Sequence, residues 1–527
     1  MEPFRAAPPP RRPDVPSARS PSAAAELARL LRSAGYTAGR IQERLATEDE
    51  LLARSPELPA YLHRLGDADE LAVLLRLFLL GVPVTRERVE GLVGAQLQKR
   101  LAETGLLVHE AAVVHGAARL VPHDELLIAS DHAGAGEAHP DHVPGVHRPS
   151  VALAHLTIRG QGERALDLCA GNGIQAILLA AHADRVIATD ANPRALAFAA
   201  FNAALNGADN IETRAGSFFE PVEGEQFDLV VANPPYVVSP ESAYLFRDSG
   251  MRGDAVSELV VKAAPTVLAP GGFACVLIAW ALDPDDPAAR PRRWLAGSGC
   301  DAFLLHTSTD DPLETAALWN RDLLDRPDLY AGVLDRWLAY YRELGIEQLG
   351  YACIVLRKRV DAHEGWLEAQ PLPRAALRPA GRHVRRLFQA HDRLSEMTSD
   401  DDFLGLRLRL VDDAVVSQET RFAEGRWHAE SITTPARARV AVLRRARPAH
   451  GATGPRSGRL DVAVRRPYRS SRRRRRARGR PLARPPDARD RLPRAERLSV
   501  GCGRRAGCGR VGRRENLVFS GVSRRTP

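Results

Sequence analysis

One four-residue sequence, Asn233-Pro234-Pro235-Tyr236, combines hydrogen-bond acceptors with an aromatic ring. Two adjacent prolines cannot continue a strand ladder, so they fix a rigid turn. The Asn233 side-chain oxygen and the Pro234 carbonyl can each accept one hydrogen of a planar NH2 group, while the Tyr236 ring stacks on its π face. Drawing these hydrogens off the amide plane favours a nitrogen with an available lone pair, which can attack an electrophilic methyl group in line. The four residues therefore predict chemistry on a planar NH2 group.

A second group of residues predicts a ligand that contains adenosine. The sequence DLCAGNG at residues 167–173 lies between a short apolar run and an apolar segment of helical spacing. Glycines in a strand-to-helix turn let a ligand approach the backbone at a helix N-terminus. Asp190 ends the next apolar run, 23 residues after Asp167, at the position of a carboxylate that binds the two hydroxyls of a ribose. The dinucleotide pattern GxGxxG is not met, because Cys169 stands where its first glycine is expected.

A parallel sheet is needed to bring these turns together. Residues from about 150 to 360 alternate strand-like apolar runs with helical patterns, which predicts an α/β fold. Because ligands sit at the carboxyl ends of parallel strands, the turns after the first, second and fourth strands face one crevice. The predicted strands are residues 164–168, 185–189, 227–232, 273–279, 302–308 and 351–356, and predicted helices are residues 174–183 and 256–268.

These motifs resemble those of class I S-adenosylmethionine-dependent methyltransferases of the small-domain type. Within that class the chain is similar to the HemK-like glutamine N5-methyltransferases, which share the Asn-Pro-Pro-Tyr motif. The resemblance covers residues 150–360 and is strongest from Asp167 to Tyr236. It implies a Rossmann-like sheet that ends in an antiparallel pair of strands, with S-adenosyl-L-methionine as the cofactor.

The resemblance also implies roles for individual residues. The turn at residues 167–173 would lie against the methionine part of the cofactor, Asp190 would bind its ribose, and residues 233–236 would hold the acceptor amide or base. Two positions depart from the family: Cys169 replaces a common glycine, and Ser217-Phe218 stands where many relatives carry an Asp for the adenine amino group. The predicted cofactor-binding residues are Asp167, Cys169, Gly171, Asn172, Gly173, Asp190, Ser217, Phe218 and Asn233, and the predicted catalytic residues are Asn233, Pro234, Pro235 and Tyr236.

Three functions remain open at this stage. The first is methyl transfer to the side-chain amide of a glutamine in a protein partner. The second is transfer to an exocyclic amine of an RNA or DNA base, which presents the same planar NH2 group. The third is a cofactor-binding regulator without activity, whose termini bind nucleic acid. No acid or base side chain is nominated, because the sulfonium donor is already reactive and its leaving group departs neutral.

The segment before the sheet predicts a separate domain. Residues 1–22 are rich in Pro, Ser and Arg and are expected to be disordered. Residues 23–130 begin with apolar residues at helical spacing and end with extended runs at 106–114 and 119–128 that could pair as a hairpin. Helices followed by a hairpin are the outline of a winged helix. A helical packing domain is an equal alternative, because no basic recognition face is visible.

Two loops flank the predicted site. Residues 131–149 carry His132, His139, His142 and His147, whose spacing matches no zinc pattern, and no metal site is predicted. Residues 244–254 have the glycine-flanked, charged character of a mobile loop over the acceptor. The charged side chains of that loop could position a substrate, but loop residues of this kind are more commonly ion-paired with one another or with neighbours.

The C-terminal part divides into two segments. Residues 361–435 are expected to form an accessory α+β segment, with a helix at 382–393 and strands at 403–411 and 415–419. Residues 436–527 hold 29 Arg against 5 Asp plus Glu, a net charge of +24, so the remaining 435 residues carry about −15. Such a tail is expected to be disordered, either as an arginine-rich arm that neutralises phosphates or as a frameshift-like translation of a GC-rich gene.

The composition is that of a globular protein. Of the 527 residues, 44% are apolar and 26% charged, and the longest apolar run, at residues 71–84, is too short to span a bilayer. The charged, proline-rich start does not look like a signal peptide, so a cytoplasmic protein without membrane contact is expected. The six cysteines form no CxxC pair, which argues against a disulfide framework. The oligomeric state is not predicted.

Overall fold

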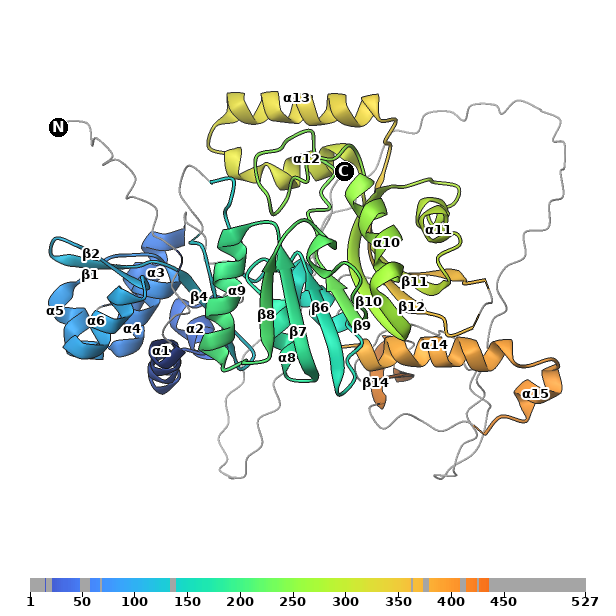
Figure 1. Ribbon diagram of the computed structural model, residues 1–527, viewed down its shortest axis with the longest axis horizontal. Coiled ribbons are helices and arrows are strands. Elements are labelled where there is room, and N and C mark those ends of the chain that lie inside the picture. The colour runs from blue at the N-terminus through green and yellow to red at the C-terminus, as the bar shows by residue number, and fades with distance from the viewer. Residues whose placement is uncertain are drawn as a thin grey trace, which may run out of the picture. The chain divides into compact units, whose positions relative to one another are not determined.

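A single eight-stranded sheet organises the part of the chain that carries the predicted site (Figure 1). In this computed structural model the described residues are 15, 21–47, 57–66, 69–132, 139–361, 364–372, 379–407, 414–423 and 426–435. The strand order is β13-β11-β12-β10-β9-β6-β7-β8. The strands are β6 (Glu163–Leu168), β7 (Ala183–Asp190), β8 (Ile211–Ala215), β9 (Phe227–Ala232), β10 (Leu268–Ala281), β11 (Cys300–Asp310), β12 (Leu349–Lys358) and β13 (Leu367–Pro371).

The five strands from β10 to β8 are parallel, and β12 runs antiparallel between β10 and β11. This confirms the Rossmann-like sheet and its antiparallel pair. Strand β9 shows why the strands of this sheet appear in the sequence as apolar runs, because all of its residues are buried except Asp228. Strands of a parallel sheet are covered on both faces and therefore read as continuous apolar runs.

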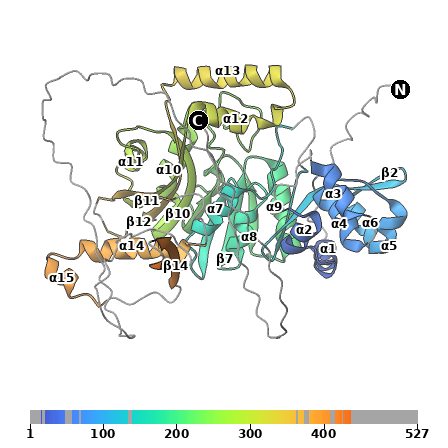
Figure 2. The same cartoon turned by 180° about the vertical axis from the view of Figure 1, so that it is seen from behind.

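Helices cover both faces of the sheet (Figure 2). Residues of α7 (Arg148–Leu156) and α8 (Ile174–Ala180) share one apolar cluster with strand residues such as Val186 and Ala188. Residues of α10 (Ala255–Val267) and α11 (Ala289–Leu295) share a second cluster with the neighbouring Ile187. Alternate residues of β7 therefore point to opposite faces, as the period of a strand requires.

The N-terminal domain contains six helices in the described residues and a small sheet. The helices are α1 (Pro21–Ser33), α2 (Ala38–Leu45), α3 (Leu58–Leu65), α4 (Glu70–Leu74), α5 (Arg86–Val93) and α6 (Ala95–Glu103), with the π-helical turn η3 (Leu75–Leu79) after α4. Strand β1 (Val84–Thr85) precedes α5, and the strands β1, β2 (Leu107–Glu110) and β3 (Val113–Gly116) pair in the order β1-β3-β2. This succession has the outline of a winged helix. Both cations of α6 are ion-paired, Arg100 with Glu26 of α1 and Lys99 with Glu103 of its own helix.

The predicted pairing of residues 106–114 with 119–128 is wrong. Strand β2 pairs with β3, and β4 (Arg119–His123) pairs with β5 (Leu126–Ser130), so the region forms two hairpins. Each turn contains a residue in the left-handed region, Ala111 and Asp124, both with φ of 49°. Asp in this conformation is common in tight hairpin turns, but Ala111 offers no such signal in the sequence.

The N-terminal domain is joined to the sheet through α9 (Pro193–Asn206), which lies between them in both views (Figures 1 and 2). The apolar cluster of the N-terminal helices includes Phe198, Phe201 and Leu205 of α9. The buried Asn202 side chain accepts from the N–H of Ala129 at 2.7 Å and donates to its carbonyl at 2.8 Å. An asparagine side chain thus pairs with β5 as a neighbouring strand would.

A helical insertion separates β11 from β12. It contains α12 (Pro312–Trp319), the 3-10 turn η5 (Arg321–Leu323) and α13 (Pro327–Glu343). The fully buried Trp337 and Tyr341 of α13 pack against Val237 and Val238, which directly follow the predicted acceptor turn.

The boundary predicted at residue 360 does not coincide with the edge of the sheet. Strand β13 pairs with β11, and Phe388 of α14 (Gly381–Ser395) is buried against Phe273, Phe303 and Trp366. The described residues 364–372 and 379–395 therefore complete the core of the sheet domain. Aromatic residues buried in this way make a large contribution to a core.

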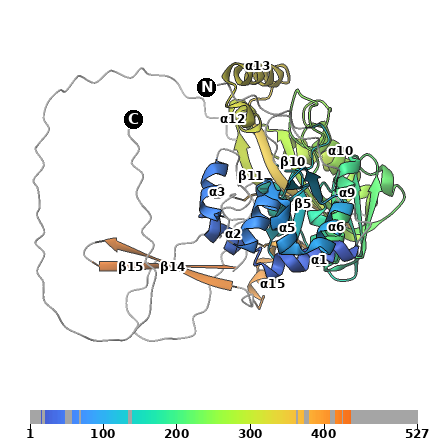
Figure 3. The ribbon, with the colours of Figure 1, turned by 90° about the vertical axis from the view of Figure 1, so that its left-hand side faces the viewer.

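The chain beyond α14 differs in part from the prediction. The helix α15 (Asp400–Leu404) overlaps the strand predicted at 403–411, and the acidic first turn of α15 is capped by Ser399. The strand predicted at 415–419 lies within β14 (Ala414–Ala423), which pairs with β15 (Arg426–Pro435) (Figure 3). The arginine-rich segment 436–527 and most of residues 1–22 lie outside the described residues, although α1 already begins at Pro21. None of the described helices is long and apolar enough to cross a bilayer.

Replacing Asn202 by Ala should lower the free energy of unfolding by about 2–4 kcal/mol. The substitution leaves the buried N–H and carbonyl of Ala129 without partners, and each buried unpaired group costs about 1–3 kcal/mol. Urea unfolding of the two proteins measures the difference. Asn206→Ala is the matched control, because Asn206 makes the same pair of bonds to Leu127 but is only half-buried, so its loss should be smaller. Equal free energies of unfolding for Asn202→Ala and the wild type would contradict a stabilising role of the hydrogen bonds between Asn202 and Ala129.

Candidate functional site

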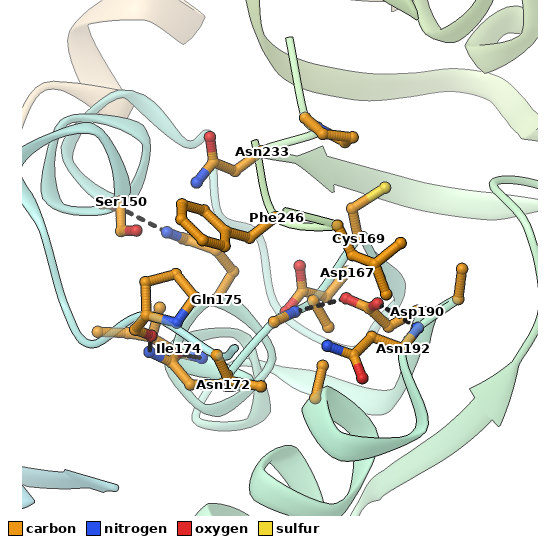
Figure 4. A pocket seen from close by; sticks show the side chains of 18 of the residues that line it. Ser150, Asp167, Cys169, Asn172, Ile174, Gln175, Asp190, Asn192, Asn233 and Phe246 are labelled. Atoms are coloured by element: carbon orange, nitrogen blue, oxygen red, sulfur yellow. Dashed lines mark hydrogen bonds between the residues drawn. The ribbon is translucent and has the colours of Figure 1, made fainter. Parts of the chain in front are cut away.

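A pocket opens at the carboxyl ends of β6, β7 and β9 (Figure 4). Its empty volume is about 970 Å³, including open solvent at the mouth. Most of the predicted site residues line it: Asp167, Cys169, Gly171, Asn172, Asp190, Ser217, Phe218, Asn233 and Pro235. Gly173, Pro234 and Tyr236 are not part of the wall.

The turn after β6 holds the first predicted motif. The Asp167 carboxylate accepts the N–H of Ala176 at 2.8 Å, which fixes the first turn of α8. Gly171 has a φ of 56° and a Cβ there would meet nothing within 4 Å, so its backbone is open to a ligand. Gly173 has a different role, because a Cβ would lie 2.8 Å from that of Ala199 in α9. The second glycine therefore permits close packing of the turn on α9.

Cys169 occupies the family's glycine position in a glycine-like conformation. Its φ is 59°, in the left-handed region that side chains other than glycine rarely adopt. Burial raises the pKa of its thiol, so the cysteine is a neutral thiol in the wall of the pocket. The backbone at Cys169 thus adopts a conformation typical of glycine, and the cysteine side chain forms part of the pocket wall.

Asp190 is held at the end of β7 by backbone groups. Its two carboxylate oxygens accept the N–H of Asn192 at 2.8 Å and that of Gly171 at 2.9 Å. An ionised carboxylate has about four acceptor positions, so two remain for ligand hydroxyls. The bond to Gly171 also joins the carboxylate to the glycine turn. Figure 4 shows Asp190 beside Asn192 in the wall of the pocket.

Two carboxyl groups therefore share a buried pocket. Burial raises the pKa of Asp167 to about 8, with a smaller contribution from the nearby charge of Asp190. Burial also raises the pKa of Asp190, against the lowering effect of its backbone hydrogen bonds. No cationic side chain pairs with either carboxyl group among the hydrogen bonds and ion pairs of the described residues. The pocket is therefore suited to a ligand that carries positive charge.

The Asn233–Tyr236 turn follows β9, as predicted, but its residues have different surroundings. Figure 4 shows the Asn233 amide pointing into the pocket, and no hydrogen-bond partner of Asn233 is found in the described part of the chain. The Pro234 carbonyl accepts the N–H of Tyr236 at 2.8 Å, which leaves one of its two lone pairs. Tyr236 is half-buried, packs on the apolar cluster around Leu277 and pairs with Asp248 through its backbone. The tyrosine thus supports the turn from behind.

Sequence reasoning missed most of one wall of the pocket. Residues 142–147 form a strap across it, between the N-terminal domain and α7, and include His142, Val143, Pro144, Gly145 and His147. The strap is held by Asn172, which donates to the Pro144 carbonyl at 3.0 Å, and by Asn192, which donates to the Asp141 carbonyl at 2.9 Å. Asn172 is itself a predicted cofactor-binding residue and Asn192 lies two residues after Asp190, but only the fold shows what their side chains bind.

A buried ion pair anchors the N-terminal end of the strap. Arg194 of α9 donates through Nε to both oxygens of Asp131, at 3.1 and 3.2 Å, and the N–H of Val143 donates to the same carboxylate at 2.8 Å. Burial alone would raise the pKa of Asp131, but the hydrogen bonds from Arg194 and Val143 outweigh it and lower the pKa. The carboxylate is therefore ionised and the strap is tied to α9.

The histidines of this segment serve the protein's own structure. His132 is half-buried and bonds the Gly116 carbonyl at 3.1 Å, and His147 caps α7 by accepting from the N–H of Ser150. Burial lowers the pKa of His132 to about 4 and also lowers that of His147, so both are neutral. His142 contacts Phe246 edge to face. Among the described residues no group of three or more His, Cys, Asp or Glu side chains could hold a metal ion.

The loop at residues 244–254 forms the opposite rim of the pocket, as expected, through Leu245 and Phe246. The N–H of Leu245 donates to the Pro140 carbonyl at 2.9 Å, which joins the loop to the strap. The charged residues of the loop are ion-paired: Arg247 with Asp248, Arg252 with Glu343, and Asp254 with Arg290. The alternative in which these charges stabilise the loop is therefore confirmed.

The helical insertion braces the same loop. Arg247 donates to the Trp319 carbonyl at 3.1 Å, Tyr341 donates to the Val238 carbonyl at 2.8 Å, and the N–H of Gly253 donates to the Tyr340 hydroxyl at 2.8 Å. The two chain segments after the Asn233–Tyr236 turn are thus fixed to α12 and α13. The sequence offered no signal for this support, because the contacts join residues about 70 to 100 positions apart.

Two parts of the chain match families of known proteins. Residues 149–283 match the family Methyltransferase small domain, and residues 33–118 match a domain of unknown function, DUF7059. The chain is 33% identical over 132 residues to a release factor glutamine methyltransferase of Xylella fastidiosa, covering 22% of this chain and 47% of that protein. It is 37% identical over 154 residues to a ribosomal protein uL3 glutamine methyltransferase of Bradyrhizobium diazoefficiens, covering 27% of this chain and 47% of that protein.

The chain thus spans less than half the length of these curated relatives. Among solved structures, the M. jannaschii TYW2 protein in complex with AdoMet is 13% identical, with a TM-score of 0.27, over 46% of this chain and 87% of that one. The sequence matches confirm that residues 149–283 resemble the HemK-like class I methyltransferases.

Asp167→Asn should change how stability depends on pH. A carboxyl group whose folded pKa of about 8 exceeds its unfolded value of 3.8 favours folding below pH 4 and disfavours it increasingly as the pH rises to 8. Each pKa unit corresponds to about 1.4 kcal/mol. The amide stays neutral and still offers an oxygen to Ala176, so the variant should gain stability over the wild type between pH 4 and 8.

Urea unfolding at several pH values measures this gain. Asp209→Asn, at an exposed position after α9, is the control and should follow the wild-type profile. Parallel profiles of Asp167→Asn and the wild type across this range would show that Asp167 is ionised in the folded protein.

Proposed function

We propose that this protein is an S-adenosylmethionine-dependent N-methyltransferase whose acceptor is the side-chain amide of a protein glutamine. The observation that carries the proposal is the convergence of Asn233 on the pocket formed by Asp190 and the turn at Gly171. These groups lie at the ends of three adjacent strands, where a Rossmann-like sheet binds its ligands. A binding site for a methyl donor and one for its acceptor would then share a single pocket.

The residues of the pocket fit the proposed cofactor. Gly171 leaves its backbone open on the ligand side, Asp190 retains acceptor positions for two ribose hydroxyls, and the pair of carboxyl groups favours a cationic ligand. When bound, the cofactor supplies a methyl group on a positively charged sulfur. Asp190 would then hold the ribose, while Asp167 and the turn at residues 169–172 would lie beside the methionine part.

Asn233 would act on the acceptor nitrogen. Its side-chain oxygen can accept one hydrogen of the incoming NH2 group, and the remaining lone pair of the Pro234 carbonyl can accept the other. Tyr236 would contribute by fixing the Pro234 carbonyl through its own N–H, rather than by stacking on the acceptor. Holding the acceptor amide in this orientation and close to the methyl group would accelerate the reaction, because the reaction then becomes effectively unimolecular.

The choice of acceptor rests on the relatives. The two curated proteins described above are named for glutamine methylation in a release factor and in ribosomal protein uL3. Both names specify a protein glutamine, so that acceptor class is proposed in preference to a nucleic-acid base. The loop that borders Asn233 supports an apolar contact with the acceptor chain, since Leu245 and Phe246 are large side chains exposed at the rim.

Substitutions at the two ends of the pocket should have different effects. Asn233→Ala should bind S-adenosylhomocysteine within about twofold of the wild type and lose turnover by about 100-fold or more, since its contact matters mainly in the transition state. Asp190→Ala should weaken binding of the same ligand by about tenfold or more. Calorimetric titration measures binding, and a labelled methyl group measures turnover. Full turnover of Asn233→Ala would contradict the proposed chemistry.

The acceptor class can be tested in an extract from cells that lack this protein. Labelled S-adenosylmethionine and the protein are added, and the products are treated with protease, RNase or DNase. We expect the label to survive the nucleases and to be removed by protease. Label removed by a nuclease would replace glutamine by a base as the acceptor, and bound cofactor without any label would support the regulator.

A further inference from the structure

One buried hydroxyl in the wall of the pocket has no hydrogen-bond partner among the residues that the structure describes. Thr189 is the penultimate residue of β7, directly before Asp190, and only 1% of its surface is exposed. Its Oγ1 makes no hydrogen bond within the described part of the chain, and the residue lines the pocket. A buried hydroxyl without a partner costs about 1–3 kcal/mol, so such groups usually have one in the functional state.

The direction of the Thr189 side chain follows from its strand. Side chains two apart on a strand point to the same face, so Thr189 shares a face with Ile187. Ile187 belongs to the apolar cluster on which Phe218 packs, whereas Val186 and Ala188 belong to the cluster on the other face. The hydroxyl therefore points to the side of the pocket that Phe218 occupies.

That side of the pocket lacks a polar group that the fold would otherwise provide. Ser217-Phe218 follows β8, where the family resemblance implies an Asp for the amino group of adenine. Ser217 is exposed to solvent and its N–H donates to the Glu220 carboxylate. Water therefore competes with a ligand for hydrogen bonds to the Ser217 hydroxyl. Phe218, held at a φ of 46°, presents a ring to the pocket but no acceptor.

We propose that the Thr189 hydroxyl replaces the missing acid and accepts a hydrogen bond from the 6-amino group of the adenine ring. The proposal rests on the proposed function, because it requires that an adenosine cofactor occupies the pocket. Asp190, the next residue, would hold the ribose, so two successive residues of one strand would read adjacent parts of one nucleoside. Phe218 would cover the face of the base, and burial would exclude the water that weakens such a bond at Ser217.

The test compares the binding of two ligands by the wild type and by two variants of Thr189, one with and one without the hydroxyl group. The ligands are S-adenosylhomocysteine and its 6-deamino analogue, in which purine replaces adenine. The variants are Thr189→Val, which keeps the shape and removes the hydroxyl, and Thr189→Ser, which keeps the hydroxyl. Thr213→Val, on the neighbouring strand β8, is the matched control. Calorimetric titration gives the dissociation constant of each protein for each ligand, without any methyl transfer.

We expect the wild type to bind the deamino analogue about five- to tenfold more weakly than S-adenosylhomocysteine, as do Thr189→Ser and Thr213→Val. In Thr189→Val this ratio should fall below about twofold, because the amino group has lost its partner. Thr189→Val should also unfold at the same temperature as the wild type or higher without ligand, since it removes an unpaired buried group.

An unchanged ratio in Thr189→Val would overturn the assignment, since the hydroxyl would then bind only water or another part of the ligand. A lower melting temperature of ligand-free Thr189→Val would also overturn it, by showing a structural role. Failure of the wild type to bind S-adenosylhomocysteine at all would refute the proposed function itself. An unchanged ratio of the two dissociation constants would refute only the role of Thr189.

Discussion

The buried amide of Asn202 connects the two halves of this protein. On one side it pairs with the backbone of Ala129 in the N-terminal domain, and on the other it donates to the carbonyl of Asn172 at 2.8 Å in the glycine turn. Every polar atom of a fully buried amide must be bonded, so the side chain has one permitted orientation. The position of the turn at the pocket therefore depends on the docking of the N-terminal domain, and the ion pair of Asp131 with Arg194 extends the same connection to the strap. The N-terminal domain is in this sense part of the pocket.

The other side of the pocket is fixed by different means. The Asn233–Tyr236 turn is rigid because of its prolines, but its orientation depends on what lies behind it. Tyr341 bonds the Val238 carbonyl from α13, and Trp337 packs against the same segment. A helical insertion between β11 and β12 thus supports the Asn233 side of the pocket, while the N-terminal domain supports the side of the glycine turn. The two supports are far apart in the sequence, and the segments that they hold meet where the N–H of Leu245 donates to the Pro140 carbonyl and where His142 contacts Phe246.

The sequence was informative where a residue's role is local. Asp190 and Gly171 were predicted from a strand end and a turn, and both line the pocket, while the strand at residues 227–232 was predicted with the bounds of β9 because all of its residues except Asp228 are buried and apolar. Roles that depend on distant contacts could not be predicted. Tyr236 is predicted as a stacking residue from its motif, and no pattern in the sequence indicates that it packs on the apolar cluster that contains Leu277 and pairs with Asp248 through its backbone. The strap at residues 142–147 has no periodicity, so only its neighbours Asn172 and Asn192 show where it runs.

The electrostatics of the pocket suggest why its two carboxyl groups tolerate each other. Two buried acids at the ends of adjacent strands repel when both are ionised, and this repulsion contributes to the raised pKa of Asp167. In the ligand-free protein the cost is reduced by protonation of Asp167 and by the backbone bonds of Asp190. A cationic ligand would offset the repulsion by its attraction to both carboxylates, and this attraction favours their ionised form. That attraction would contribute to the binding free energy, less the cost of deprotonating Asp167, and a neutral product that lacks the positive sulfur would gain less from it. The same pair of acids would therefore favour binding of the methyl donor over retention of the spent cofactor.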